Sequence, residues 1–176
     1  MAPRFKARVA GSFYLITFLA GGFALLADGQ SGFAAGLIAG LCYIIVTLLL
    51  YGLFKPVSRN LSLLAALISL AGCSVGPLSM LFKWPAPANN VSLVLFGLYC
   101  LLIGYLILKS TFLPHVLGGL MAFAGLGWLT FVSPSLAQSL SPYVFAPGII
   151  GEGALTIYLL LVGVDAQKWT EQASAQ

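Results

Sequence analysis

Charged residues are scarce in this sequence. They make up 7% of its 176 residues, whereas hydrophobic residues make up 60%. A soluble domain needs about a quarter of its residues charged to cover its surface. The chain therefore cannot solvate itself as a compact globule, and its apolar surface must face lipid. The net charge of +4 comes from scattered basic residues without a basic run, so nucleic acid is not an expected partner.

Residues that hold metals or form disulfides are also few. The sequence has one histidine and three cysteines, Cys42, Cys73 and Cys100, all within apolar segments. An odd, dispersed set without a C-x-x-C motif is not a disulfide or zinc framework. We interpret the cysteines as small buried apolar residues. We expect no metal site and no catalytic constellation, and the pattern assigns no cofactor, pigment or quinone.

Six apolar stretches account for most of the chain. Each is about 20 residues long, the length that crosses a hydrocarbon core of roughly 30 Å. They lack strict alternation, which favours helices over a barrel. We predict an all-α integral membrane bundle of six transmembrane helices, a single domain over residues 1–176, with a Ser- and Pro-rich connection at 134–143. The predicted spans are Val9–Ala27, Gly32–Phe54, Leu61–Phe82, Val91–Leu108, Val116–Ser133 and Phe145–Val164.

The basic residues predict the orientation of the bundle. With the N-terminus inside, the outer segments contain Lys83 as their one basic residue, and the other seven Lys and Arg are inside. Such a bias is typical of cytoplasmic loops, so both termini are expected in the cytoplasm. A basic start before an apolar run also describes a signal peptide, but this run is long and no A-x-A site follows. The inner residues are Arg4, Lys6, Arg8, Lys55, Arg59, Lys109 and Lys168.

One acidic residue, Glu152, lies well inside a predicted span, about 10 Å from the outer end of its helix. A charge at this depth is costly, so Glu152 is either ionised with a partner or protonated. It is the first candidate for a proton, cation or ligand site, and an interhelical hydrogen bond is the equally weighted alternative. Lys83, at the outer end of the third helix, is a candidate to pair with Glu152 by reaching down. Residues expected at comparable depth, as hydrogen-bond donors or further site candidates, are Ser74, Ser79, Tyr99 and Trp128.

Helix breaks and small residues give further signals. Pro77 is expected to kink the third helix and to free a carbonyl near residue 73. An interrupted helix in the same half of the membrane as Glu152 is a pointer to a transporter site. The G-x-x-x-G of Gly36 and Gly40, and a small-residue face in the fifth helix from Gly118 to Gly125, predict close helix packing.

At the inner face, Lys55 and Arg59 are candidates for contact with lipid headgroups or a partner protein. Topology and helix capping are the favoured explanation of both.

Several motifs resemble a family of small bacterial membrane proteins catalogued as domain of unknown function 4386. The resemblance covers nearly the whole chain and implies six helices in a bacterial inner (plasma) membrane, without implying an activity. It directs attention to Arg59, Pro114 and Glu152. His115 stands where an arginine is more usual. The motifs are Arg8-Val-Ala-Gly-Ser-Phe-Tyr14-Leu, Leu50-Tyr51-Gly-Leu-Phe-Lys55-Pro56-Val-Ser-Arg59, Gly104-Tyr105-Leu-Ile-Leu-Lys109-Ser110-Thr-Phe-Leu-Pro114, Leu117-Gly118, Gly151-Glu152, Leu159-Leu-Leu-Val-Gly163-Val and Trp169.

Three functions remain open. The leading hypothesis is a non-enzymatic accessory, assembly or ligand-binding membrane subunit, because polar residues inside the spans are few and loops are short. The second is a small oligomeric transporter or channel that uses Glu152 and the kinked third helix. The third, a membrane enzyme acting on lipid or isoprenoid substrates, needs convergent acids or a metal that the sequence does not supply. Besides the lipid bilayer, another membrane protein or a second copy of the chain are the partners considered.

Overall fold

The computed structural model describes residues 2–81 and 88–175, without the side chains of residues 76–81 and 88–89. Within these ranges the chain is almost entirely helical and contains no strand, which confirms the predicted all-α class. The elements are α1 (Pro3–Leu26), α2 (Gly29–Phe54), α3 (Arg59–Leu81), α4 (Ala88–Lys109), α5 (His115–Leu129), the 3₁₀ turn η1 (Thr130–Val132), α6 (Pro134–Ser139), the 3₁₀ turn η2 (Tyr143–Phe145), α7 (Ala146–Leu161) and α8 (Ala166–Ser174).

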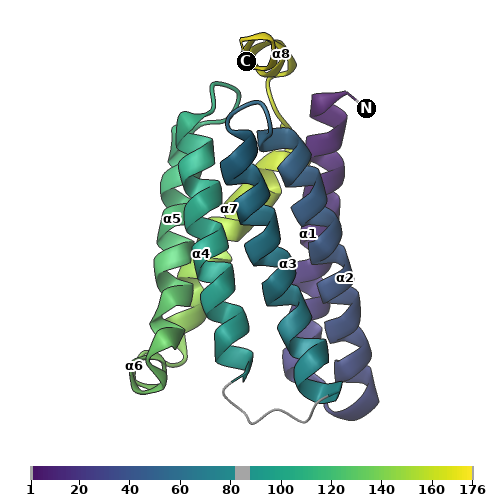
Figure 1. The fold of residues 1–176 in the computed structure, drawn as a ribbon. Helices are drawn as coiled ribbons and strands as arrows, with labels where there is room; N and C mark the ends of the chain where they lie inside the picture. Colours follow the sequence, from purple (N-terminus) through teal and green to yellow (C-terminus); the bar gives the residue numbers. More distant parts are fainter. Residues whose placement is uncertain (1, 82–87, 176) are drawn as a thin grey trace.

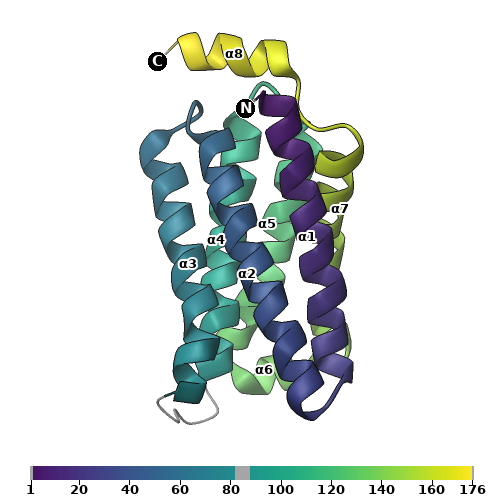
Figure 2. The ribbon, with the colours of Figure 1, turned by 90° about the vertical axis from the view of Figure 1, so that its right-hand side faces the viewer.

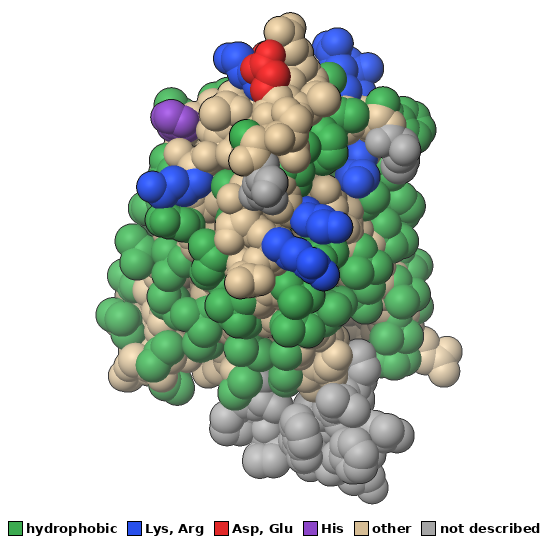
Figure 3. Space-filling view, turned by 45° about the horizontal axis from the view of Figure 1, so that its top comes forward, with side chains coloured by type: hydrophobic (Ala, Val, Ile, Leu, Met, Phe, Trp, Pro, Cys, Tyr) green, Lys and Arg blue, Asp and Glu red, His purple; other side chains and the backbone are tan. Residues whose placement is uncertain are grey.

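Length and apolar composition indicate a membrane protein. Among the described residues five helical segments are long and apolar enough to cross a bilayer, and a shorter apolar helix covers Arg59–Val75. Large side chains such as Leu26, 88% exposed, point outward from the bundle, and hydrophobic residues cover its sides (Figure 3). The count of six crossings stays a prediction. The five segments are Pro3–Leu26, Gly29–Phe54, Asn90–Lys109, His115–Val132 and Tyr143–Leu161.

Six helices close into a ring. Each packs against the next in the order α1, α2, α3, α4, α5 and α7, and α7 returns to α1. Both termini and α8 lie at one end, called the terminal end below, and α6 lies at the opposite, distal end (Figures 1 and 2). The first and the last helix of the ring are therefore neighbours, so residues of α1 and α7 can form a common site.

Glycine allows α4 and α5 to approach closely. A Cβ atom at Gly104 would lie 2.8 Å from the Gly118 carbonyl oxygen, and one at Gly125 would lie 2.8 Å from that of Gly97. The predicted small-residue face of the fifth helix is confirmed. In contrast, the G-x-x-x-G of α2 is not a tight contact, because a Cβ at Gly40 would have no neighbour within 4 Å. The prediction of close packing there is wrong, since these small residues border a cavity instead.

The sequence predicts a Ser- and Pro-rich connection at 134–143. In the structure this connection contains the short helix α6, which begins at Pro134. Proline is favoured in the first turn of a helix since its missing N–H has no partner there anyway. Helix α3 continues through Pro77 to Leu81. The predicted kink at Pro77 stays a prediction.

The chain after the last span returns to the bundle as α8. The Asp165 side chain caps this helix by accepting hydrogen bonds from the backbone of Gln167 and Lys168. The Trp169 indole N–H donates to the Leu53 carbonyl at 2.8 Å. This second contact holds α8 across the end of α2, so the terminal end of the bundle is partly covered.

Candidate functional site

The Glu152 carboxyl is the centre of a buried polar cluster. Its Oε2 accepts hydrogen bonds from the hydroxyls of Tyr14 at 2.6 Å and Tyr43 at 3.2 Å. Its Oε1 accepts one from the Trp128 indole N–H at 2.6 Å. Trp128 is one of the residues that the sequence predicts as a possible partner of Glu152. The donors come from α1, α2 and α5, so this carboxyl joins four helices of the ring.

Charge is unbalanced at this carboxyl within the described part of the chain. Glu152 is 6% exposed, and the single ion pair found among the described residues is Lys168 with Asp165 at the surface. Besides the three aromatic donors, the Cys100 thiol also lies within hydrogen-bonding reach of this carboxyl. None of these groups carries a positive charge, so a cationic ligand or a proton can neutralise Glu152.

Aromatic rings surround the cluster. The Tyr14 and Tyr43 rings meet edge to face at 5.4 Å between centroids. Phe96 lies 5.0 Å from the Tyr43 ring, and Phe18 stacks on Tyr14 at 5.8 Å. Such pairs fix ring orientation as well as burying area. The carboxyl group is therefore presented inside a rigid aromatic frame.

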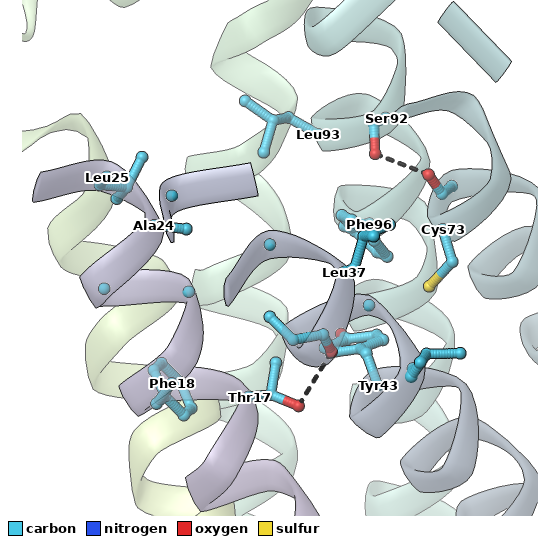
Figure 4. Close-up of a pocket in the computed structure, with 18 of the residues that line it drawn as sticks. Thr17, Phe18, Ala24, Leu25, Leu37, Tyr43, Cys73, Ser92, Leu93 and Phe96 are labelled. Carbon is cyan, nitrogen blue, oxygen red and sulfur yellow. Dashed lines mark hydrogen bonds between the residues drawn. The ribbon is translucent and has the colours of Figure 1, made fainter. Parts of the chain in front are cut away.

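A cavity of about 970 Å³ opens beside this frame. It extends from Glu152 and Trp128 to the turn between α1 and α2, where Asp28 borders it, and its wall is mostly apolar. Figure 4 shows wall residues from α1, α2, α3 and α4, with hydrogen bonds from Thr17 to the Ala39 carbonyl and from Ser92 to that of Gly72. Small residues of α1, α2 and their connection line much of it: Gly21, Gly22, Ala24, Ala27, Gly29, Gly32, Gly36, Ala39 and Gly40.

Glycine also sets the position of Glu152. A Cβ atom at Gly151 would overlap the Leu120 carbonyl oxygen and lie 2.8 Å from the Ala124 side chain. Helix α7 therefore lies against α5 at this level, which brings Glu152 to Trp128. Gly153 has open space around its Cβ position, so one of the two glycines flanking Glu152 has a packing role.

The other predicted site residues are dispersed. Ser74 is exposed on α3, where its hydroxyl donates to the Leu70 carbonyl at 2.8 Å, so the structure does not bring it to Glu152. Tyr99 packs its ring on Tyr43 at 5.9 Å, but its hydroxyl is not a donor to Glu152. Lys83 lies outside the described residues, and the side chain of Ser79 is not described.

The basic candidates Lys55 and Arg59 lie at the terminal end, in and beside the connection of α2 to α3, where both are exposed. They do not border the cavity. Their predicted contact with headgroups or a partner is separate from the Glu152 cluster and stays a prediction.

Tyr14 and Tyr43 were the residues that the sequence did not single out. Each lies 11 residues from the terminal end of its helix, roughly 16 Å at 1.5 Å per residue. Counting depth in this way places both near the level of Glu152. The signal was present, but seven tyrosines and unknown helix order left the pairing open. Cys73 was also interpreted as buried, whereas it is half-buried and borders the cavity.

Comparison with known proteins agrees with the resemblance seen in the sequence. Residues 78–163 match the family model described as domain of unknown function DUF4386, which confirms that resemblance over these residues. An uncharacterized protein of Archaeoglobus fulgidus is 27% identical over an alignment of 127 residues, and the match covers 67% of this chain and 75% of that protein. No solved structure matches. Trp128 and Glu152 lie within the family match, whereas Tyr14 and Tyr43 lie outside it. The comparisons bring no activity.

Proposed function

We propose that this membrane protein binds an organic cation with an apolar, aromatic body, and that Glu152 is its counter-ion. The observation that carries the proposal is a buried carboxyl without a basic partner among the described residues, placed at the end of a large apolar cavity. This is the ligand-binding form of the membrane-subunit hypothesis that the sequence favours.

Electrostatics supports a cationic ligand. A carboxylate deep in a bilayer is costly unless it is paired or protonated. The hydrogen bonds from Tyr14, Tyr43 and Trp128 lower that cost but carry no positive charge. A monovalent cation in the cavity would neutralise Glu152. In the absence of such a ligand a proton would do so.

The aromatic frame supports the same class of ligand. Cations are attracted to the faces of aromatic rings. The side chains of Phe18 and Phe96 border the cavity beside the tyrosines. The volume of about 970 Å³ is at the upper end of ordinary ligand sites. An apolar wall of this size favours a body with rings or branched chains over a bare metal ion.

The proposal is tested by a pair of probes that differ in charge alone. Purified protein in mild detergent is titrated with an aromatic quaternary ammonium ion and with its uncharged carbon isostere. We expect the ammonium ion to bind at least tenfold more tightly. Glu152→Gln should abolish this preference, since it removes the carboxylate but keeps a side chain of the same size. Isothermal calorimetry measures both affinities.

Glu171→Gln is the matched control, because Glu171 is an exposed acid of α8 far from the cavity. It should bind both probes like the unaltered protein. Equal binding of the two probes would overturn the proposal and favour a neutral ligand hydrogen-bonded to a protonated Glu152. Binding of neither probe would favour a structural role for this residue.

We also propose that the protein lies in the inner (plasma) membrane, with both termini in the cytoplasm. The support is the distribution of charge: Lys and Arg side chains gather at the end that carries α8 and the termini (Figure 3). Positive residues of this kind favour the cytoplasmic side. Contact with another membrane protein or a second copy remains compatible with the exposed apolar sides.

A further inference from the structure

Four buried hydroxyl groups lie behind the aromatic frame, between α2, α3 and α4. Thr47 and Ser69 hydrogen-bond each other at 2.6 Å. The Tyr99 hydroxyl lies near that of Thr47 but outside hydrogen-bond geometry. Ser62, on the first turn of α3, has a buried hydroxyl without a hydrogen-bond partner. None of these groups borders the cavity, so the proposed binding site does not account for them.

The two unpartnered hydroxyls are the informative ones. Tyr99 and Ser62 are each 1% exposed, and a buried hydroxyl without a partner destabilises the fold. Phenylalanine and alanine would avoid that cost with little change of shape. Buried polar groups of this kind are normally satisfied by ordered water, so both positions point to hydration inside the bundle.

The buried face of α3 joins these positions. Ser62, Ala65, Ala66 and Ser69 follow at the spacing of one helix face, and all four are buried. Ser62 and Ser69 are two turns apart, about 10 Å. The two alanines between them are buried in the same face of the helix. At the distal end of this face, Cys73 contacts Ser69 and borders the cavity.

We infer that this set of hydroxyls carries protons between Glu152 and the terminal end of the bundle, through water held at Tyr99 and Ser62. The inference rests on the proposed function of Glu152 and extends it to an exchange of one proton for one monovalent cation. The proton reaches Ser62 through water, and each hydroxyl along the set accepts one proton and releases its own. Tyr43, which already donates to Oε2, accepts the last one and passes its own proton to the Glu152 carboxylate. The cation then loses its counter-ion and leaves, so one positive charge replaces another.

The groups around Glu152 suit such a transfer. No lysine or arginine among the described residues faces it, so its charge depends on the ligand or the proton alone. Trp128 of α5 donates its N–H and does not titrate. The titratable side chains that face the cluster are those of Tyr14 from α1, Tyr43 from α2, Cys73 from α3, and Tyr99 and Cys100 from α4.

The test uses vesicles in which the protein is selected for one orientation, with the terminal end outward. A fluorescent aromatic quaternary ammonium ion is bound first, and the outer solution is then made acid in a stopped-flow instrument. The protein should release the probe rapidly. Tyr99→Phe and Ser62→Ala should each slow this release at least tenfold, with unchanged equilibrium affinity for the probe.

These two substitutions separate a proton route from a structural role. Each removes an unpartnered hydroxyl, so a purely structural role predicts equal or higher thermal stability and an unchanged rate of release. Ser74→Ala is the matched control on α3, because its hydroxyl is exposed and bonded within the helix; it should release the probe at the original rate.

Release at the original rate from both Tyr99→Phe and Ser62→Ala, with binding intact, would overturn the proton route and leave the binding proposal standing. Failure of the unaltered protein to bind the ammonium ion would overturn the binding proposal, and the route with it.

Discussion

Tyr14 and Glu152 are 138 positions apart in the sequence, yet their side-chain oxygens lie 2.6 Å from each other. At the scale of residues the carboxyl is held by three aromatic donors, and each offers both a polar hydrogen and an apolar ring. This chemistry suits a group that must be accessible to a ligand and still be tolerated inside lipid. Replacement of one donor should therefore affect both stability and binding.

Tyr14→Phe removes the shorter of the two hydroxyl contacts to Oε2 while it keeps the ring on Phe18. We expect the free energy of unfolding to fall by about 1 kcal/mol, the usual contribution of a buried hydrogen bond. Thermal unfolding in mild detergent measures it. Tyr105→Phe is the control, because Tyr105 is 47% exposed and should change stability little. Equal effects of the two substitutions would contradict the assigned contact.

At the scale of elements, glycine has different surroundings in two pairs of helices. Between α4 and α5 the glycines meet backbone carbonyls within 3 Å of their Cβ positions, so the helices are in direct contact. Along α1 and α2 the small residues instead border the cavity. The same residue type therefore lies in a tight backbone contact between one pair of helices and lines the cavity along another pair.

Gly104→Ala should destabilise the bundle by about 2 kcal/mol, because the added methyl overlaps the Gly118 carbonyl and forces α4 from α5. The matched control is Gly119→Ala on α5, where the added Cβ has nothing within 4 Å. It should be neutral or slightly stabilising, since alanine is the better helix former. Denaturation monitored by circular dichroism compares the two; a neutral Gly104→Ala would refute the close contact.

The sequence predicted the helices well and their contacts partly. Long apolar runs make the helices unambiguous, and a carboxyl is unusual in such a run, which is why Glu152 is the first candidate from sequence alone. Depth along a helix can be counted from its end, but its rotation toward a neighbour cannot. For that reason the sequence could not show that Ser74 is exposed on α3, and it did not distinguish Tyr43 from the other tyrosines. The G-x-x-x-G of α2 failed for the same reason.

At the scale of the whole molecule, both termini lie at the end where basic side chains gather (Figures 2 and 3). A cysteine introduced at Ser139 in α6 should react with an impermeant maleimide in intact cells. One introduced at Ser174 in α8 should react only after the cells have been permeabilised. Both positions are exposed, so access depends on the side of the membrane. The native cysteines, which lie in helices α2, α3 and α4, provide the background measurement. The reverse pattern of labelling would overturn the proposed orientation.

The arginines of α1 donate hydrogen bonds to backbone carbonyls at the C-terminal end of α7. Arg4 donates to the Val162 carbonyl at 3.3 Å and Arg8 to that of Leu161 at 3.2 Å, while Gly163 turns the chain away at a φ of +81°. The first and last helices of the bundle are thus joined by contacts of Arg4, Arg8 and Tyr14. During synthesis α1 is made long before its partner, so the ring can close only after α7 is complete.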